Sequence, residues 1–177
     1  MGLENLSKVD WQTILGVASA IIALCAFAIS VWQGVVSRKH NRMSVRPHLT
    51  TWRHSSASRG YYQVDLINNG IGPALIEKFS VKIDGKVLPG TELEAIDKAM
   101  KILFPNTSYT MGKAYVGRGY AMAPKERCTI VSVQFTGGAV PSPEIVEHAL
   151  LSRADLEVRY KSFYGEEFKL ETEKLKA

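Results

Sequence analysis

The chain has 177 residues and a formal net charge of +5 at pH 7, and 46% of its residues are hydrophobic. Once an N-terminal apolar segment is set aside, about 130 residues remain, which is enough for one domain with a core and too few for two. Residues 47–177 carry only +2 of the charge, so the composition excludes duplex nucleic acid as an expected partner.

The first predicted element is a transmembrane helix over residues 11–36. No side chain between Asp10 and Arg38 is charged, and Trp11 and Trp32 stand near the two ends of this stretch. At ~1.5 Å rise per residue the two tryptophans lie about 33 Å apart, against a hydrocarbon core of ~30 Å. Indole rings suit both interfaces, because they combine an apolar ring with a polar N–H group.

Flanking charges predict the orientation of this span. A basic linker over residues 37–46 follows it, whereas residues 1–10 carry a net charge of −1. Positive charge stays in the cytoplasm, so we expect an extracytoplasmic tail at 1–10 and a cytoplasmic domain. The four linker cations are also candidates for contact with anionic lipid headgroups. They are Arg38, Lys39, Arg42 and Arg46.

A cleaved signal peptide is the alternative interpretation of this segment. The residues Ala26-Phe27-Ala28 offer a small-residue cleavage site. The leader is not basic, however, and the apolar run is long for a signal core, so the sequence favours a retained anchor.

Small and polar residues form one stripe along the predicted helix. Steps of four and three residues give Gln12, Gly16, Ser19, Ala23, Ala26, Ser30, Gln33 and Ser37. A repeat of ~3.5 residues is the geometry of left-handed helix packing, and small side chains let two backbones approach closely. Three interpretations stay open: a homo-oligomeric interface, a narrow polar path through the membrane, and chance. For the first, the candidate packing residues are Gly16, Ser19, Ala23, Ala26 and Ser30.

Residues 47–177 predict an antiparallel β domain. Strands are expected at 48–53, 61–67, 75–83, 86–88, 108–114, 128–135, 155–161 and 166–173, with a glycine-containing loop at 115–123. In the third strand Leu75, Glu77, Phe79, Val81 and Ile83 are expected to share one face, and Asp84-Gly85 to form a hairpin turn.

Two short helices are predicted between the strands. Thr91 and Glu94 have the spacing of a capping box ahead of an apolar helical face. Ser142, followed by Pro143, is expected to begin a helix that runs to about Arg153. About seven strands with two helical insertions predict an immunoglobulin-like antiparallel β-sandwich without the usual disulfide.

The segment 68–74, Asn-Asn-Gly-Ile-Gly-Pro-Ala, separates the second and third strands. Glycine and asparagine accept positive φ and proline fixes a turn, so we expect a tight corner here.

The arrangement resembles a group of uncharacterised bacterial single-pass membrane proteins with a cytoplasmic immunoglobulin-like sandwich. The resemblance is carried by the membrane helix with its basic exit, by Arg46-Pro47, by the Asn69-Gly70-Ile71-Gly72-Pro73-Ala74 corner, and by the late hairpin from Tyr160 to Gly165. It implies a bacterial source and an inner-membrane location, and it assigns no chemistry.

The sequence predicts no catalytic, cofactor-binding or metal site. Its four histidines are scattered, without ligands at metal-binding spacing. Cys25 lies in the span and Cys128 in a strand, so a disulfide between them is not expected, in keeping with a reducing cytoplasm.

One loop suggests a ligand. Lys113, Tyr115, Arg118 and Tyr120 interleave cations with aromatic rings, a combination that can stack a base and hold a phosphate. The alternative is a solvated hairpin tip. Arg53, His54 and Arg59 are further candidates for the same site.

The expected function is a non-enzymatic, membrane-anchored interaction or sensing module that self-associates through its helix and binds a cytoplasmic protein. The alternative is a ligand-gated membrane effector, in which a nucleotide-like signal rearranges the helices and perturbs the membrane. That alternative would resemble effectors of bacterial antiviral signalling in layout. An enzyme is the third and least favoured hypothesis.

Overall fold

The computed structural model describes residues 11–56, 59–137 and 140–172. The chain divides into two compact units, Met1–Met43 and Ser44–Ala177. The predicted extracytoplasmic tail, residues 1–10, lies outside the described residues.

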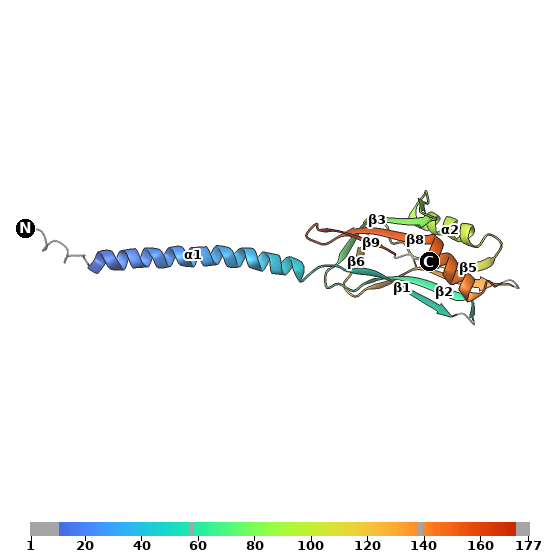
Figure 1. Cartoon of the computed structure of the whole chain (residues 1–177), viewed down its shortest axis with the longest axis horizontal. Coiled ribbons are helices and arrows are strands. Elements are labelled where there is room, and N and C mark those ends of the chain that lie inside the picture. The colour runs from blue at the N-terminus through green and yellow to red at the C-terminus, as the bar shows by residue number, and fades with distance from the viewer. Residues whose placement is uncertain (1–10, 57–58, 138–139, 173–177) are drawn as a thin grey trace, which may run out of the picture. The chain divides into compact units, whose positions relative to one another are not determined.

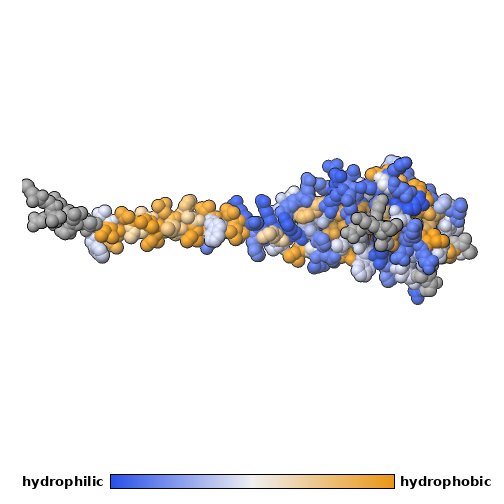
Figure 2. Space-filling view, in the orientation of Figure 1, coloured by the Kyte–Doolittle hydropathy of each residue, from blue (hydrophilic) through white to orange (hydrophobic). Residues whose placement is uncertain are grey.

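The first unit contains one helix, α1 (Trp11–Met43), none of whose side chains is buried. It is long and apolar enough to cross a membrane, and Figure 2 shows its apolar surface. The helix continues past residue 36 through Arg38, Lys39 and Arg42, so most of the predicted linker is helical. No proline interrupts it before Pro47, and cations are favourable near a helix C-terminus.

The second unit is a sandwich of two antiparallel sheets, which form the two layers of Figure 1. One sheet has the order β1 (Leu49–Ser56), β2 (Tyr61–Asn68), β7 (Arg127–Thr136), β5 (Ser108–Lys113). The other has the order β4 (Lys86–Val87), β3 (Ala74–Ile83), β8 (Ala154–Lys161), β9 (Glu167–Glu171), and β6 (Ala121–Met122) also pairs with β3.

This order confirms the immunoglobulin-like prediction. An immunoglobulin sandwich places strands A-B-E-D in one sheet and C′-C-F-G in the other. Strands β1-β2-β7-β5 and β4-β3-β8-β9 follow the same two orders. The sequence-based boundaries differ most at β1, which extends to Ser56, and at β6, which lies in a segment expected to be loop.

Helices α2 (Glu92–Leu103) and α3 (Pro143–His148) confirm the two predicted insertions. Thr91 and Glu94 form the expected capping box, and Ser142 caps α3 by accepting a hydrogen bond from a backbone N–H. A π-helical turn, η2 (Ala149–Arg153), continues α3 into β8. Asp84 and Gly85 both have positive φ (50° and 81°), as a two-residue hairpin turn requires.

Strand β3 corrects one prediction about side-chain direction. Ile76 pairs with Tyr160 and Lys78 with Arg159, so Glu77 is an extra residue in a β-bulge. The bulge shifts the alternation by one residue. Ile76 is therefore buried together with Phe79. Leu75 and Glu77, which were expected to share a face with Phe79, are not buried.

The core lies between the two sheets. It is completed by the apolar face of α2 and by Val146 and Ala149 beyond the sheets. Leu66 and Val158, one from each sheet, are 0% exposed. The domain thus has a core of its own that includes no residue of α1.

Candidate functional site at the entry end of the domain

Asn68, the last residue of β2, connects three segments at the end where the chain enters the domain. Its side chain is 0% exposed. Its Oδ1 accepts hydrogen bonds from the backbone N–H groups of His48 (3.1 Å) and Gly70 (3.0 Å). Its Nδ2 donates to the carbonyls of Gly72 (2.8 Å) and Ala123 (3.1 Å). One amide therefore joins the start of the domain, the corner and the turn before β7.

Gly70 and Gly72 are needed for close approach and not for backbone freedom. Neither has a positive φ, so that part of the expectation about the corner is wrong. A methyl group on Gly72 would lie 1.6 Å from the carbonyl oxygen of Val45, and one on Gly70 would lie 2.4 Å from that of Arg46. The Arg46 carbonyl accepts a hydrogen bond from the N–H of Ile71 (3.2 Å). The corner therefore holds the entering chain directly against its own backbone.

Arg46 also ties this corner to the turn between β8 and β9. Its Nε lies 3.3 Å from Oε2 of Glu166, and its guanidinium carbon lies 5.9 Å from the centre of the Phe168 ring. The turn is held by Ser162, whose Oγ accepts hydrogen bonds from the N–H groups of Tyr164 and Glu166, each at 3.2 Å. The corner and the turn consequently lie at the same end of the sandwich.

Large apolar side chains are exposed at this end. Ile71 is 62% exposed and Phe163 is 74% exposed. Lys125 lies at the corner, with its Nζ 2.7 Å from the carbonyl oxygen of Asn69. We call this surface the entry face, and it consists of Arg46, Ile71, Lys125, Phe163 and Tyr164. Apolar side chains among cations are the composition of surfaces that contact the lipid interface.

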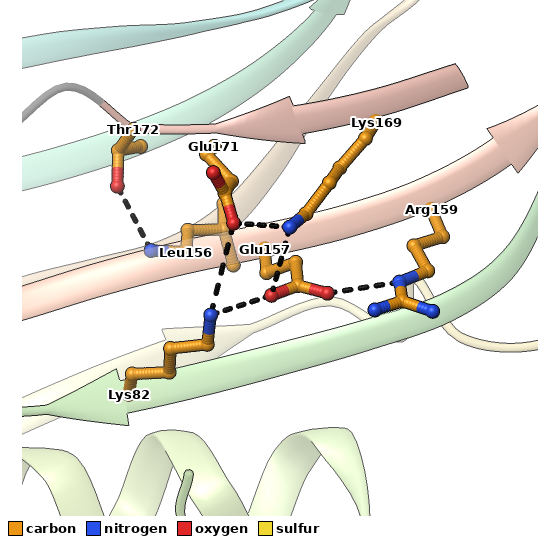
Figure 3. A network of polar contacts seen from close by, with 7 residues as sticks. All are labelled: Lys82, Leu156, Glu157, Arg159, Lys169, Glu171 and Thr172. Carbon is orange, nitrogen blue, oxygen red and sulfur yellow. Dashed lines mark hydrogen bonds and ion pairs between the residues drawn. The ribbon is translucent and has the colours of Figure 1, made fainter. Parts of the chain in front are cut away.

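A second cluster lies on the outer face of the β3-β8-β9 sheet (Figure 3). Glu157 is 6% exposed and accepts hydrogen bonds from Lys82 Nζ (2.5 Å) and Arg159 Nε (2.9 Å). Lys169 Nζ lies 3.6 Å from the same carboxylate and also pairs with Glu171. The hydrogen bond from Lys82 is the main cause that lowers the pKa of Glu157 to about 2, against the opposing effect of burial.

A further buried acid, Asp65, lies on the outer face of β2. It is 1% exposed and accepts hydrogen bonds from Gln63 Nε2 (2.7 Å) and the Thr129 hydroxyl (2.8 Å). Arg127 Nε lies 3.6 Å from its second oxygen. Both buried carboxylates, those of Asp65 and Glu157, thus already accept hydrogen bonds and pair with cations. These contacts favour a structural role for the two acids over proton transfer.

The four residues of the predicted ligand loop make separate contacts. Lys113 donates to Asp97 of α2 at 2.5 Å, and the Tyr115 hydroxyl donates to the carbonyl of Arg118 at 3.2 Å. The Tyr120 hydroxyl donates to Glu126 at 2.5 Å, and this hydrogen bond, followed by burial, raises the pKa of Tyr120 well above its ordinary value. Three of the four side chains therefore already donate hydrogen bonds within the domain.

The predicted stripe and headgroup residues fall on different parts of the chain. The five stripe residues lie in α1, where the Ser19 and Ser30 hydroxyls donate to the carbonyls of Leu15 and Ala26, each at 2.8 Å. Arg38, Lys39 and Arg42 lie in the last turns of α1, whereas Arg46 belongs to the domain.

Within the described ranges, no group of three or more His, Cys, Asp or Glu side chains is placed to hold a metal ion. Cys25 and Cys128 are both free thiols. Burial raises the pKa of the Cys128 thiol.

Sequence reasoning missed the Asn68 hub and the Glu157 cluster. Both depend on residues far apart in the chain. The local signal was limited to the corner itself, where two glycines flank Ile71.

No protein-family model matches this sequence, and no curated protein is significantly similar to it. The resemblance to bacterial single-pass membrane proteins consequently stays a prediction.

Proposed function

We propose that this protein is a non-enzymatic, membrane-anchored interaction or sensing module that self-associates through α1. Its domain would present a surface to a cytoplasmic partner protein, and the bilayer would be its second partner. The positive charges that follow the span support a cytoplasmic domain with the N-terminus outside. A bacterial inner membrane is the location that agrees with the resemblance given above.

One observation carries this proposal: α1 has no buried residue, while the domain has a core of its own that includes no residue of α1. An apolar helix of this length must cover its side chains with lipid or with another helix. Inside the bilayer, association depends on close packing of small residues. A methyl group on Gly16 would meet nothing within 4 Å in the chain itself, so the space beside the stripe is free for a second copy.

The serine hydroxyls of the stripe favour packing over a polar path. Ser19 and Ser30 each donate to a carbonyl one turn earlier in α1. Because these hydrogen bonds stay within the helix, the hydroxyls need no water-filled passage.

The test is a double substitution on the stripe in the full-length protein. Ala23→Leu with Ala26→Leu should weaken self-association in a mild detergent by about tenfold or more, because the larger side chains keep the backbones apart. Ile21→Leu, on the opposite side of the helix, is the matched control and should leave the association constant unchanged. Molecular mass at several protein concentrations gives the measurement. Equal behaviour of the two variants, or a monomeric parent, would refute self-association through the stripe.

We further propose that the entry face contacts the lipid headgroups. Only Ser44 separates the last residue of α1 from Val45, which the corner holds to the domain. The chain therefore enters the domain at this face, whose exposed apolar side chains among cations suit the lipid interface. Exposed Phe163 and Ile71 would then lie in the interface, where aromatic and aliphatic side chains are favourable.

The alternative, a ligand-gated effector that takes a nucleotide at the 113–120 loop, has weaker support. Lys113 and Tyr120 are engaged by Asp97 and Glu126. Both contacts would have to break for the four side chains to surround one ligand, so we favour the interaction module.

A further inference from the structure

The core of the sandwich is not completely filled. A cavity of about 100 Å³, partly open to solvent, lies between the two sheets, and α2 and η2 contribute to its wall. Apolar side chains dominate the lining, among them Val64, Phe79, Met100, Leu150 and Leu156. Apolar cavities of this size accept small apolar molecules.

A second cavity of about 50 Å³ adjoins the first, since Arg53, Val64 and Leu150 line both. Its lining is more polar and adds Tyr62 and Glu147. The two cavities together therefore offer an apolar compartment beside a compartment with hydrogen-bonding and charged groups.

Tyr62 lines this second compartment, and its hydroxyl is unsatisfied. Tyr62 is 7% exposed, and its hydroxyl has no hydrogen-bond partner among the residues that the structure describes. Leaving such a buried donor unpaired destabilises the folded protein. Burial, and secondly the charge of Glu147, raise the pKa of Tyr62, so the hydroxyl keeps its proton and needs an acceptor.

Arg53 supplies a cation to the same compartment. Within residues 11–56, 59–137 and 140–172 it makes no hydrogen bond or ion pair, and the charge of Glu147 acts on it from beyond ion-pair distance. Partial burial lowers the pKa of Arg53, but a guanidinium stays charged in proteins. Arg53 is exposed at the edge of the two cavities, so its guanidinium can donate hydrogen bonds to an anion that enters them.

We propose that these two cavities bind a small carboxylate with an apolar tail. The tail would fill the cavity between the sheets, and the carboxylate would accept hydrogen bonds from the Tyr62 hydroxyl and the Arg53 guanidinium. The inference goes beyond the proposed function, because it depends on neither the span nor self-association.

The volume of the cavity limits the length of the ligand's apolar tail. An engineered cavity of about 150 Å³ holds benzene, so a cavity of about 100 Å³ holds roughly four carbon atoms. Each buried methylene group should strengthen binding about fourfold until the cavity is full. Affinity should therefore rise from butyrate to about hexanoate and then stop rising. Nucleotides are much too large for this space.

The experiment titrates the full-length protein in phosphatidylcholine nanodiscs with butyrate, hexanoate and decanoate, by calorimetry, with empty nanodiscs as the blank. Hexylamine has a similar tail without the anion and should not bind. Tyr62→Phe keeps the ring and removes the donor, and it should weaken hexanoate binding about tenfold. Arg53→Gln should weaken binding by a similar factor.

Glu147→Gln tests whether a negative charge beside the site weakens anion binding. Its carboxylate would repel the bound anion, so this variant should bind hexanoate more tightly than the parent. Tyr61→Phe and Arg59→Gln are matched controls, because neither residue lines the two cavities. Both should bind as the parent does.

Saturable hexanoate binding that Tyr62→Phe and Arg53→Gln weaken, and that Glu147→Gln strengthens, supports the site. The proposal is overturned if hexanoate does not bind saturably at up to about 10 mM, if Tyr62→Phe binds as the parent does, or if hexylamine binds equally well. A failure here leaves self-association intact, because the stripe residues are measured without any carboxylate.

Discussion

Gly72→Ala is predicted to loosen the attachment of the entering chain to the domain. The added methyl group would lie 1.6 Å from the carbonyl oxygen of Val45, and backbone atoms cannot yield as a flexible side chain does. Overpacking of this kind costs about 1–3 kcal/mol. The Arg46 carbonyl would also lose its hydrogen bonds from Ile71 (3.2 Å) and Gly72 (3.4 Å), worth about 1 kcal/mol each at most. We therefore expect the free energy of unfolding to fall by about 3 kcal/mol.

The matched control is Gly85→Ala in the β3–β4 turn. Gly85 has a φ of 81°, but a methyl group there would meet nothing within 4 Å. Its cost is backbone strain alone, about 1 kcal/mol. The comparison therefore separates a steric requirement for glycine from a conformational one.

Two measurements on the full-length protein test this reasoning. Urea unfolding followed by circular dichroism gives the difference in free energy between the two variants. Hydrogen exchange then locates the effect: the amides of Asn69 and Ile71 should lose protection in Gly72→Ala and keep it in Gly85→Ala. If Gly72→Ala costs no more than Gly85→Ala and both amides stay protected, the close approach does not hold the entering chain.

The remaining predictions concern the Glu157 cluster and the entry face. The pKa of Glu157 in the folded protein, about 2, lies below its ordinary value of 4.5, so the stability from this carboxylate is complete above pH 4.5 and is lost as the pH falls toward 2. With screening by solvent the loss should be about 1–2 kcal/mol between pH 6 and pH 2 in urea unfolding, and an identical pH dependence in Glu157→Gln would contradict it. For the entry face, Phe163→Trp in nanodiscs with brominated lipids should show more fluorescence quenching than the parent, and Val87→Trp, at the exposed β3–β4 hairpin, should not. Equal quenching of the two variants would argue against headgroup contact.

Several features of this protein could be predicted from the sequence because neighbouring residues decide them. The charge-free stretch beginning at Trp11 is enough to predict a helix that is long and apolar enough to cross a membrane. Thr91 and Glu94 close their capping box within one turn, and Asp84-Gly85 need only their own positive φ to form the hairpin. The strand pattern was also sufficient to predict the immunoglobulin-like sandwich, because short strands with turns between them have few ways to bury their apolar faces.

Only the tertiary structure decided the contacts between residues distant in the chain. The sequence indicates a corner at Gly70 and Gly72, but the reason for glycine is the Val45–Arg46 backbone, which is brought there by folding. The bulge at Glu77 depends on how β3 pairs with β8, and it reverses which side chains are buried. Tyr62 and Arg53 look like ordinary strand residues until the packing of two sheets and a helical turn leaves a space beside them. Local patterns fix backbone conformation through nearest-neighbour sterics and hydrogen bonds, whereas a cavity or a close backbone approach is set by the packing of the whole domain.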